Sequence, residues 1–132
     1  MTTYTNNSLG KRTAYWVTTG LLSLCMLSGG LAQLFRVKTT VDGFIHLHYP
    51  PYLTSILGIW KVAGVVVLLT PRLPLVKEWA YAGFFFAMTG AVASHLFSGD
   101  SLVKALSPLV MALLTVASWY LRPASRRLQP AF

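Results

Sequence analysis

The segment at residues 52–70 has the sequence YLTSILGIWKVAGVVVLLT, an almost wholly apolar run with one lysine, Lys61, near its middle. A run of about 18 or more apolar residues is long enough to cross the hydrocarbon core of a bilayer as an α-helix. A charged side chain at that depth costs roughly 2.5–3.5 kcal/mol on insertion scales. The segment therefore predicts a membrane-spanning helix in which a partner, a water-filled pocket, a bound anion or loss of the proton offsets the cost of Lys61.

The composition of the whole chain indicates a membrane protein. Hydrophobic residues make up 55% of the 132 positions and charged residues only 11%, whereas soluble domains are about 25% charged. The chain has room for about four spanning helices of roughly 20 residues each. No separate soluble domain fits, so we expect a single transmembrane domain over residues 1–132.

The net charge of +8 comes from 11 Lys and Arg residues against 3 Asp and Glu residues. In a soluble protein this balance would point to nucleic acid. Here the basic residues cluster at the ends of apolar runs, where they set membrane topology, so we expect the lipid bilayer as a partner and no nucleic acid. Cys25 is the only cysteine, which excludes an intrachain disulfide and a dithiol redox mechanism.

Three further apolar runs predict an all-α, integral membrane four-helix bundle. We expect helices over about residues 13–35, 52–69, 77–97 and 101–121, with residues 1–12 as a short polar tail. Residues 36–50 contain a turn signal at Asp42-Gly43, and apolar and polar residues alternate from Phe44 to Tyr49. Alternation with period two favours an extended piece or a short hairpin. Because an unpaired strand cannot face lipid, we expect this segment either at the membrane interface or tucked into a mouth between the helices.

Basic residues in the short loops predict the orientation. Seven of them lie in the N-terminal tail, the 71–77 loop and the C-terminal tail, against three on the other side. The seven are Lys11, Arg12, Arg72, Lys77, Arg122, Arg126 and Arg127, and the three are Arg36, Lys38 and Lys104. The positive-inside rule then places both termini in the cytoplasm and residues 36–50 outside it. We expect a multi-pass protein of the bacterial inner membrane.

Small residues recur at helical spacing in three of the expected helices, and such stripes let helix backbones approach closely. The stripes are Cys25, Gly29 and Ala32; Thr54, Gly58, Lys61 and Gly64; and Gly83, Ala87, Gly90, Ala91 and Ser94. The stripe that holds Lys61 is therefore predicted to face the bundle and not the lipid.

Lys61 is about nine residues from either end of its helix, or roughly 13 Å from either membrane surface at a rise of about 1.5 Å per residue. No carboxylate lies at a similar depth. Three explanations stay open. Lys61 is neutral and bonded to a serine, threonine or backbone oxygen; or it meets Asp42, if residues 36–50 dip inward; or it faces a ligand that carries an anionic group or a carbonyl.

Polar side chains gather toward the outer side of the expected bundle. They are Gln33, Asp42, His46, His48, His95 and Asp100. Because histidine, glutamine and lysine donate well to carbonyl oxygens, these residues and Lys61 are our candidates for a ligand-binding site, and a quinone or a lipid head group has the matching chemistry. A metal held by the histidines is a weaker alternative, and we assign no metal site. No phosphate-binding loop, nucleophile elbow or metalloprotease motif occurs.

Several stretches carry a resemblance to a known family. They are SGGLAQL at 28–34, LGIWKVAG at 57–64, LTPR at 69–72, KEWAYAGFFF at 77–86, TGA at 89–91, Ser94-His95 and Gly99-Asp100. With these, the chain resembles the DoxX-like family of small four-helix membrane proteins from about Tyr15 to Leu121. The wider family includes subunits named for thiosulfate–quinone oxidoreduction, proteins linked to oxidative stress and relatives of receptor-assembly chaperones. It offers no agreed set of catalytic residues. Many relatives have a lysine where this chain has Gln33, which weakens any argument from a shared charged site.

Three classes of function stay open on the sequence. The leading hypothesis is an accessory or small-molecule-binding protein that holds a quinone or another lipophilic ligand near Lys61 and serves a redox partner. The second is an enzyme that acts on a lipid-soluble substrate, such as an isomerase, cyclase or quinone reductase, with Lys61 or His95 as acid or base. The third is an assembly subunit or chaperone that docks another membrane protein through its small-residue faces.

Overall fold

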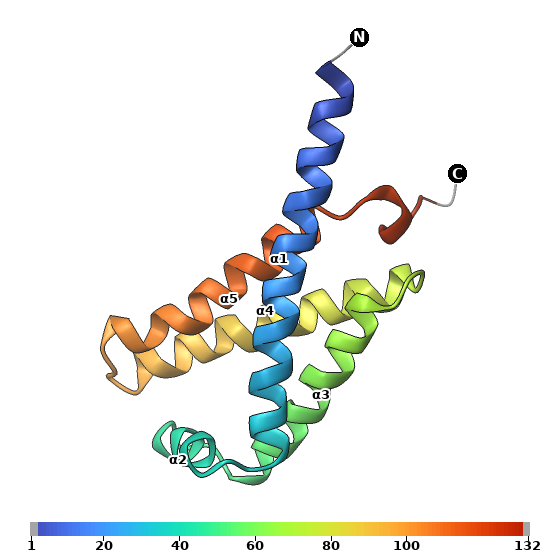
Figure 1. The fold of residues 1–132 in the computed structure, drawn as a ribbon. Coiled ribbons are helices and arrows are strands. Elements are labelled where there is room, and N and C mark those ends of the chain that lie inside the picture. Colours follow the sequence, from blue (N-terminus) through green and yellow to red (C-terminus); the bar gives the residue numbers. More distant parts are fainter. Residues whose placement is uncertain (1–2, 131–132) are drawn as a thin grey trace.

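The computed structural model describes residues 3–130 and is all-α, with four long apolar helices (Figure 1). The long helices are α1 (Thr3–Leu34), α3 (Tyr52–Leu69), α4 (Pro74–Phe97) and α5 (Leu102–Tyr120), and the short ones are α2 (Lys38–His46) and η1 (Ala124–Arg126). Each long helix contains a stretch that is long and apolar enough to cross a membrane. The chain is therefore a multi-pass integral membrane protein.

Both ends of the chain lie at one end of the bundle, and α2 lies at the other (Figure 1). We call these the terminal end and the α2 end. The first helix begins at Thr3 and not near residue 13, so the predicted polar tail is wrong for every residue that the structure describes. The reason is that residues 3–12 contain no proline and only one glycine, and adding residues to an existing helix needs no new nucleus.

Residues 38–46 form a helix, so the extended or hairpin segment predicted for residues 36–50 is wrong. Asp42 and Gly43 lie inside this helix and do not make a turn. The partly buried positions of the segment are Thr40, Val41, Phe44 and Leu47. Their spacing of one, three and three residues places them on one face of a helix. The alternation of apolar and polar residues after Phe44 made this helical spacing harder to recognise in the sequence.

Three helices end in the same way: the residue just past the end of each has a positive φ, in the left-handed region of the Ramachandran plot. Arg36 (φ 52°), His48 (φ 66°) and Gly99 (φ 76°) follow α1, α2 and α4. In each case the backbone N–H of the following residue donates a hydrogen bond to the carbonyl oxygen five residues earlier. The pairs are Val37 to Ala32, Tyr49 to Phe44 and Asp100 to His95. This is the Schellman arrangement, which satisfies the last carbonyls of a helix.

Glycines set the closest helix pair, α1 and α3. A Cβ built at Gly58 would lie 2.7 Å from the backbone nitrogen of Leu34 and 2.8 Å from the carbonyl oxygen of Gly30. Thr54, Gly58 and Gly64 are buried, which confirms that this stripe faces the bundle. On α1 the partner is Gly30, whereas Cys25 is exposed, so the predicted stripe through Cys25 is wrong.

The apolar core lies between α1, α3, α4 and α5. It consists of Leu22, Met26, Val65, Leu68, Tyr81, Phe84, Met88 and Ala112. Large apolar side chains also point outward, among them Phe97 (92% exposed), Phe86 (70%) and Leu113 (62%). In water such an apolar surface would promote aggregation, whereas in a bilayer it faces lipid chains.

Candidate ligand-binding site

Two glycines of the small-residue stripe on α4, Gly83 and Gly90, line open space, whereas Ala87 packs against the apolar core. A Cβ built at Gly83 or Gly90 would meet no other atom within 4 Å. Gly83 lines a cavity of about 350 Å³ between α3 and α4. Gly90 lines a second cavity of about 390 Å³ that extends to α2. Gly83 and Gly90 therefore leave room beside α3, which a close helix contact would have removed.

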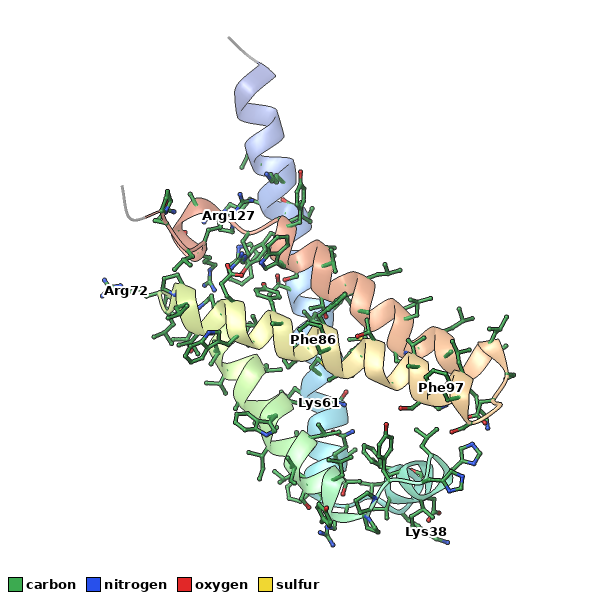
Figure 2. The ribbon with its side chains drawn as sticks, turned by 180° about the vertical axis from the view of Figure 1, so that it is seen from behind. Lys38, Lys61, Arg72, Phe86, Phe97 and Arg127 are labelled. Carbon is green, nitrogen blue, oxygen red and sulfur yellow. The ribbon has the colours of Figure 1, made fainter. Side chains whose placement is uncertain are left out.

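Lys61 lines both cavities, together with Leu57 and Ala87. Its side chain lies between α3 and α4, with α1 behind it (Figure 2). A Cβ built at Gly29 would lie 3.9 Å from the Lys61 Nζ, so the glycine of α1 leaves room for the ammonium group.

Lys61 forms no hydrogen bond or ion pair with any residue in the range 3–130. Within this range, neither the bond to a serine, threonine or backbone oxygen nor the pair with Asp42 is present. The Lys61 ammonium group lies partly buried at the middle of α3. Its N–H donors are therefore available to a ligand in the cavities.

Gln33 lines the second cavity and carries a second polar group without a protein partner. Its side chain is only 7% exposed, and its carbonyl oxygen has no hydrogen-bond partner in the described part of the chain. The walls around it are mostly apolar, with Phe44, Leu53 and Met88 among them. A cavity of about 300–1,000 Å³ with apolar walls and a few convergent polar groups is typical of a small-molecule site.

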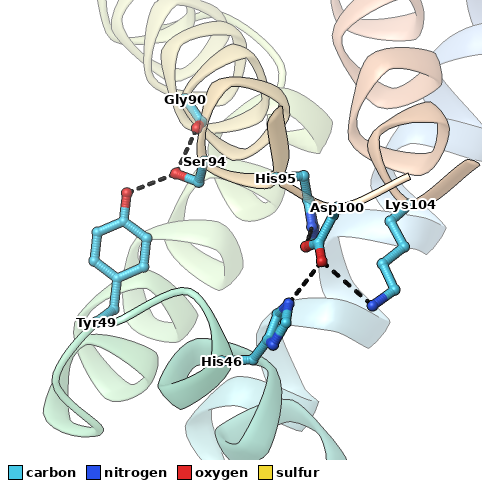
Figure 3. A network of polar contacts seen from close by, with 7 residues as sticks. All are labelled: His46, Tyr49, Gly90, Ser94, His95, Asp100 and Lys104. Carbon is cyan, nitrogen blue, oxygen red and sulfur yellow. Dashed lines mark hydrogen bonds and ion pairs between the residues drawn. The ribbon is translucent and has the colours of Figure 1, made fainter. Parts of the chain in front are cut away.

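A polar network joins α2 to the end of α4 beside this cavity (Figure 3). His46 Nε2 lies 2.8 Å from Asp100 Oδ1, and His95 Nδ1 lies 2.8 Å from Asp100 Oδ2. Tyr49 and Ser94 share a second link, with 2.6 Å between their hydroxyl oxygens. These links connect residues 46–49 with residues 94–100, two stretches that are far apart in the sequence, so they hold α2 beside the cavity.

The two histidines also stabilise the charged form of Asp100. Hydrogen bonds from His95 and, second, from His46 lower the pKa of Asp100 from 3.8 to about 2. A carboxylate whose pKa is lower in the folded state stabilises the fold above its unfolded pKa, and this contribution disappears as the pH falls through the folded value. The link between α2 and α4 should therefore weaken between about pH 4 and about pH 2.

We expect Asp100→Asn to lower the melting temperature of the detergent-solubilised protein at pH 6 and to flatten its pH dependence. The asparagine has no charge to lose, so between pH 6 and pH 2 only the wild type should lose the contribution of this carboxylate. Melting curves of both proteins over this range test the prediction. Parallel pH profiles for the two proteins would contradict it.

The structure separates the predicted site residues into three groups. Lys61, Gln33 and His95 line the second cavity. His46 and Asp100 belong to the network that holds α2 in place. Asp42 and His48 are exposed and line neither cavity.

Sequence reasoning missed several polar residues at the second cavity. Thr39, Thr40 and Tyr49 all line it, and Ser94 was noticed only as a small residue. The helical spacing of Thr40, Val41, Phe44 and Leu47 was the signal that could have found the contribution of α2. Within residues 3–130 no group of three or more His, Cys, Asp or Glu side chains is arranged to hold a metal ion.

Comparison with known proteins gives two matches. Residues 17–118 match the model of the DoxX-like family. The chain is also similar to YdgD of Bacillus subtilis (strain 168), an uncharacterized protein, with 25% identity over 100 residues that cover 72% of this chain and 85% of the relative. No solved structure shows a significant match.

Proposed function

This chain belongs to the DoxX-like family, and we propose that it binds a lipophilic small molecule at Lys61, in the cavities between α3, α4 and α2. A quinone or quinol is the ligand class with the best chemical fit. In this proposal the protein stores or presents the ligand to a redox protein in the same membrane and does not itself catalyse a reaction.

The observation that carries the proposal is the pair of free polar groups on one cavity. Lys61 presents only donors, and the Gln33 carbonyl oxygen presents only an acceptor. A buried polar group without a partner costs about 1–3 kcal/mol, so a ligand that satisfies both groups gains affinity from both. A quinone carbonyl accepts from Lys61, and a quinol hydroxyl donates to Gln33. The aromatic and aliphatic walls suit the ring and the start of an isoprenoid chain.

The ligand has a route from the bilayer in this proposal. Trp60 and Trp79 line the first cavity, and their side chains are 68% and 66% exposed on the lipid-facing surface. A hydrophobic molecule can therefore enter sideways between α3 and α4 without crossing water.

The same two tryptophans provide the test, because quinones quench indole fluorescence. We expect a short-chain ubiquinone analogue to quench the wild type saturably in detergent, and Lys61→Met to bind it at least about tenfold more weakly. Hydrogen bonds to charged groups are worth about 1.5–3 kcal/mol, which corresponds to a factor of about 10 to 100 in affinity.

Lys38→Met is the matched control, because Lys38 is exposed on α2 and lines neither cavity. It should bind like the wild type. Equal affinity in the Lys61→Met protein, or quenching that never saturates, would contradict the proposal.

A further inference from the structure

A third, separate cavity lies at the terminal end of the bundle, where the N-terminal part of α1 meets the 71–72 loop and the C-terminal tail. Its volume is about 830 Å³. Six of its lining residues are cationic: Lys11, Arg12, Arg72, Arg122, Arg126 and Arg127. No acidic residue in the described part of the chain lines it. So many cations around one cavity attract an anion strongly.

Most of this charge is not neutralised by the protein. Of the six cations, only Arg122 forms an ion pair with another residue of the described part of the chain, with 2.7 Å between its Nη2 and the Glu78 Oε1. Arg126 donates to the carbonyl oxygen of Leu68 at 2.9 Å, and Arg127 to that of Tyr120 at 2.8 Å. Bonds to carbonyls hold these guanidinium groups in place but leave their charge uncompensated. The side chain of Arg12 has no hydrogen-bond or ion-pair partner among residues 9–130.

An apolar groove continues from this cavity along α1. It is lined by Leu9, Arg12, Thr13, Trp16 and Val17 and has a volume of about 420 Å³. It shares Leu9, Arg12 and Trp16 with the basic cavity. Trp16 and Val17 are 42% and 55% exposed on the lipid-facing side of α1. A ligand that fills both spaces has an anionic head at the arginines and an apolar tail along α1.

We propose that this cavity is a binding site for an anionic phospholipid, with the phosphate held by the arginines and Lys11, and an acyl chain lying in the groove beside Trp16. Guanidinium groups bind carboxylates and phosphates through paired hydrogen bonds. A phosphate has more acceptor oxygens than a carboxylate, so it can bond several of these six cations at once. The groove favours a lipid over a soluble phosphate. The site is remote from Lys61 and does not depend on the function proposed above.

Native mass spectrometry of the full-length, delipidated protein in detergent tests this site. We expect the wild type to retain phosphatidylglycerol at least about tenfold more strongly than phosphatidylcholine. The double variant Lys11→Gln/Arg12→Gln should lose this preference. The matched double variant Arg36→Gln/Lys38→Gln, which removes the same charge at the α2 end, should keep it.

Equal retention of the two lipids by the wild type, or a preference that persists in Lys11→Gln/Arg12→Gln, would overturn the proposal. Glycerol 3-phosphate that competes as well as phosphatidylglycerol would show a soluble phosphate site and overturn the lipid assignment. If the double variant does not fold, Arg72→Gln replaces it, because Arg72 lines the same cavity and its exposed side chain contributes little to the fold, and it should reduce the preference for phosphatidylglycerol.

Discussion

Replacing Gly58 with alanine is expected to cause the largest loss of stability of any glycine-to-alanine substitution in this chain. The added Cβ would lie 2.7 Å and 2.8 Å from backbone atoms of α1, at Leu34 and Gly30. A flexible side chain could rotate away, but backbone atoms move only if the whole helix moves. Overpacking of this kind costs about 1–3 kcal/mol or more, so we expect α1 and α3 to separate and the melting temperature in detergent to fall by several degrees or more.

Gly20→Ala is the matched control for this prediction. Gly20 also lies in a spanning helix, and a Cβ there would meet no atom within 4 Å. Because alanine is a better helix former than glycine by about 1 kcal/mol, this variant should be as stable as the wild type or more so. A Gly58→Ala protein that melts like Gly20→Ala would contradict the close packing of α1 on α3.

The second large effect is expected from Lys77→Met at the terminal end. The Lys77 side chain is fully buried, and its Nζ donates to three carbonyl oxygens, those of Val67, Thr70 and Arg72. These carbonyls belong to the end of α3 and the loop that follows it. Each one left unsatisfied costs about 1–3 kcal/mol, so we expect a loss of at least about 3 kcal/mol and a loosened 70–74 loop.

Trypsin cleavage after Arg72 measures this loosening directly. Lys77→Met should be cut there much faster than the wild type, whereas Lys38→Met, which removes an exposed lysine, should not. Cleavage at the wild-type rate in Lys77→Met would show that the loop does not depend on this side chain.

The number and type of the spanning helices could be predicted from the sequence, because an apolar run of sufficient length has only one stable form in lipid. The segment between the first two spans could not. Residues 36–50 lie at the edge of the apolar region, where neither lipid nor water alone decides the structure, and a short alternation around His46 resembled a strand. The helical spacing of Thr40, Phe44 and Leu47 was also present in the sequence, but it spans only about two turns and is a weaker signal than the alternation.

The candidate site was predictable only in part. Lys61 and Gln33 stood out because a polar residue within an apolar helix needs a partner. The pairing of His46 and His95 with Asp100 was not predictable, because it depends on the direction of α2 and on the left-handed turn at Gly99. The role of the α4 glycines was also ambiguous, since small residues can close a gap between helices or open one.

The central claim is that the space around Lys61 holds a lipophilic molecule. The most direct measurement is native mass spectrometry with lipid extraction of the protein purified in mild detergent, in wild-type, Lys61→Met and Lys38→Met forms. Our account predicts a co-purifying quinone or similar small lipid in the wild type and in Lys38→Met, and its loss in Lys61→Met. An empty wild type, or the same ligand retained equally by all three proteins, would contradict it.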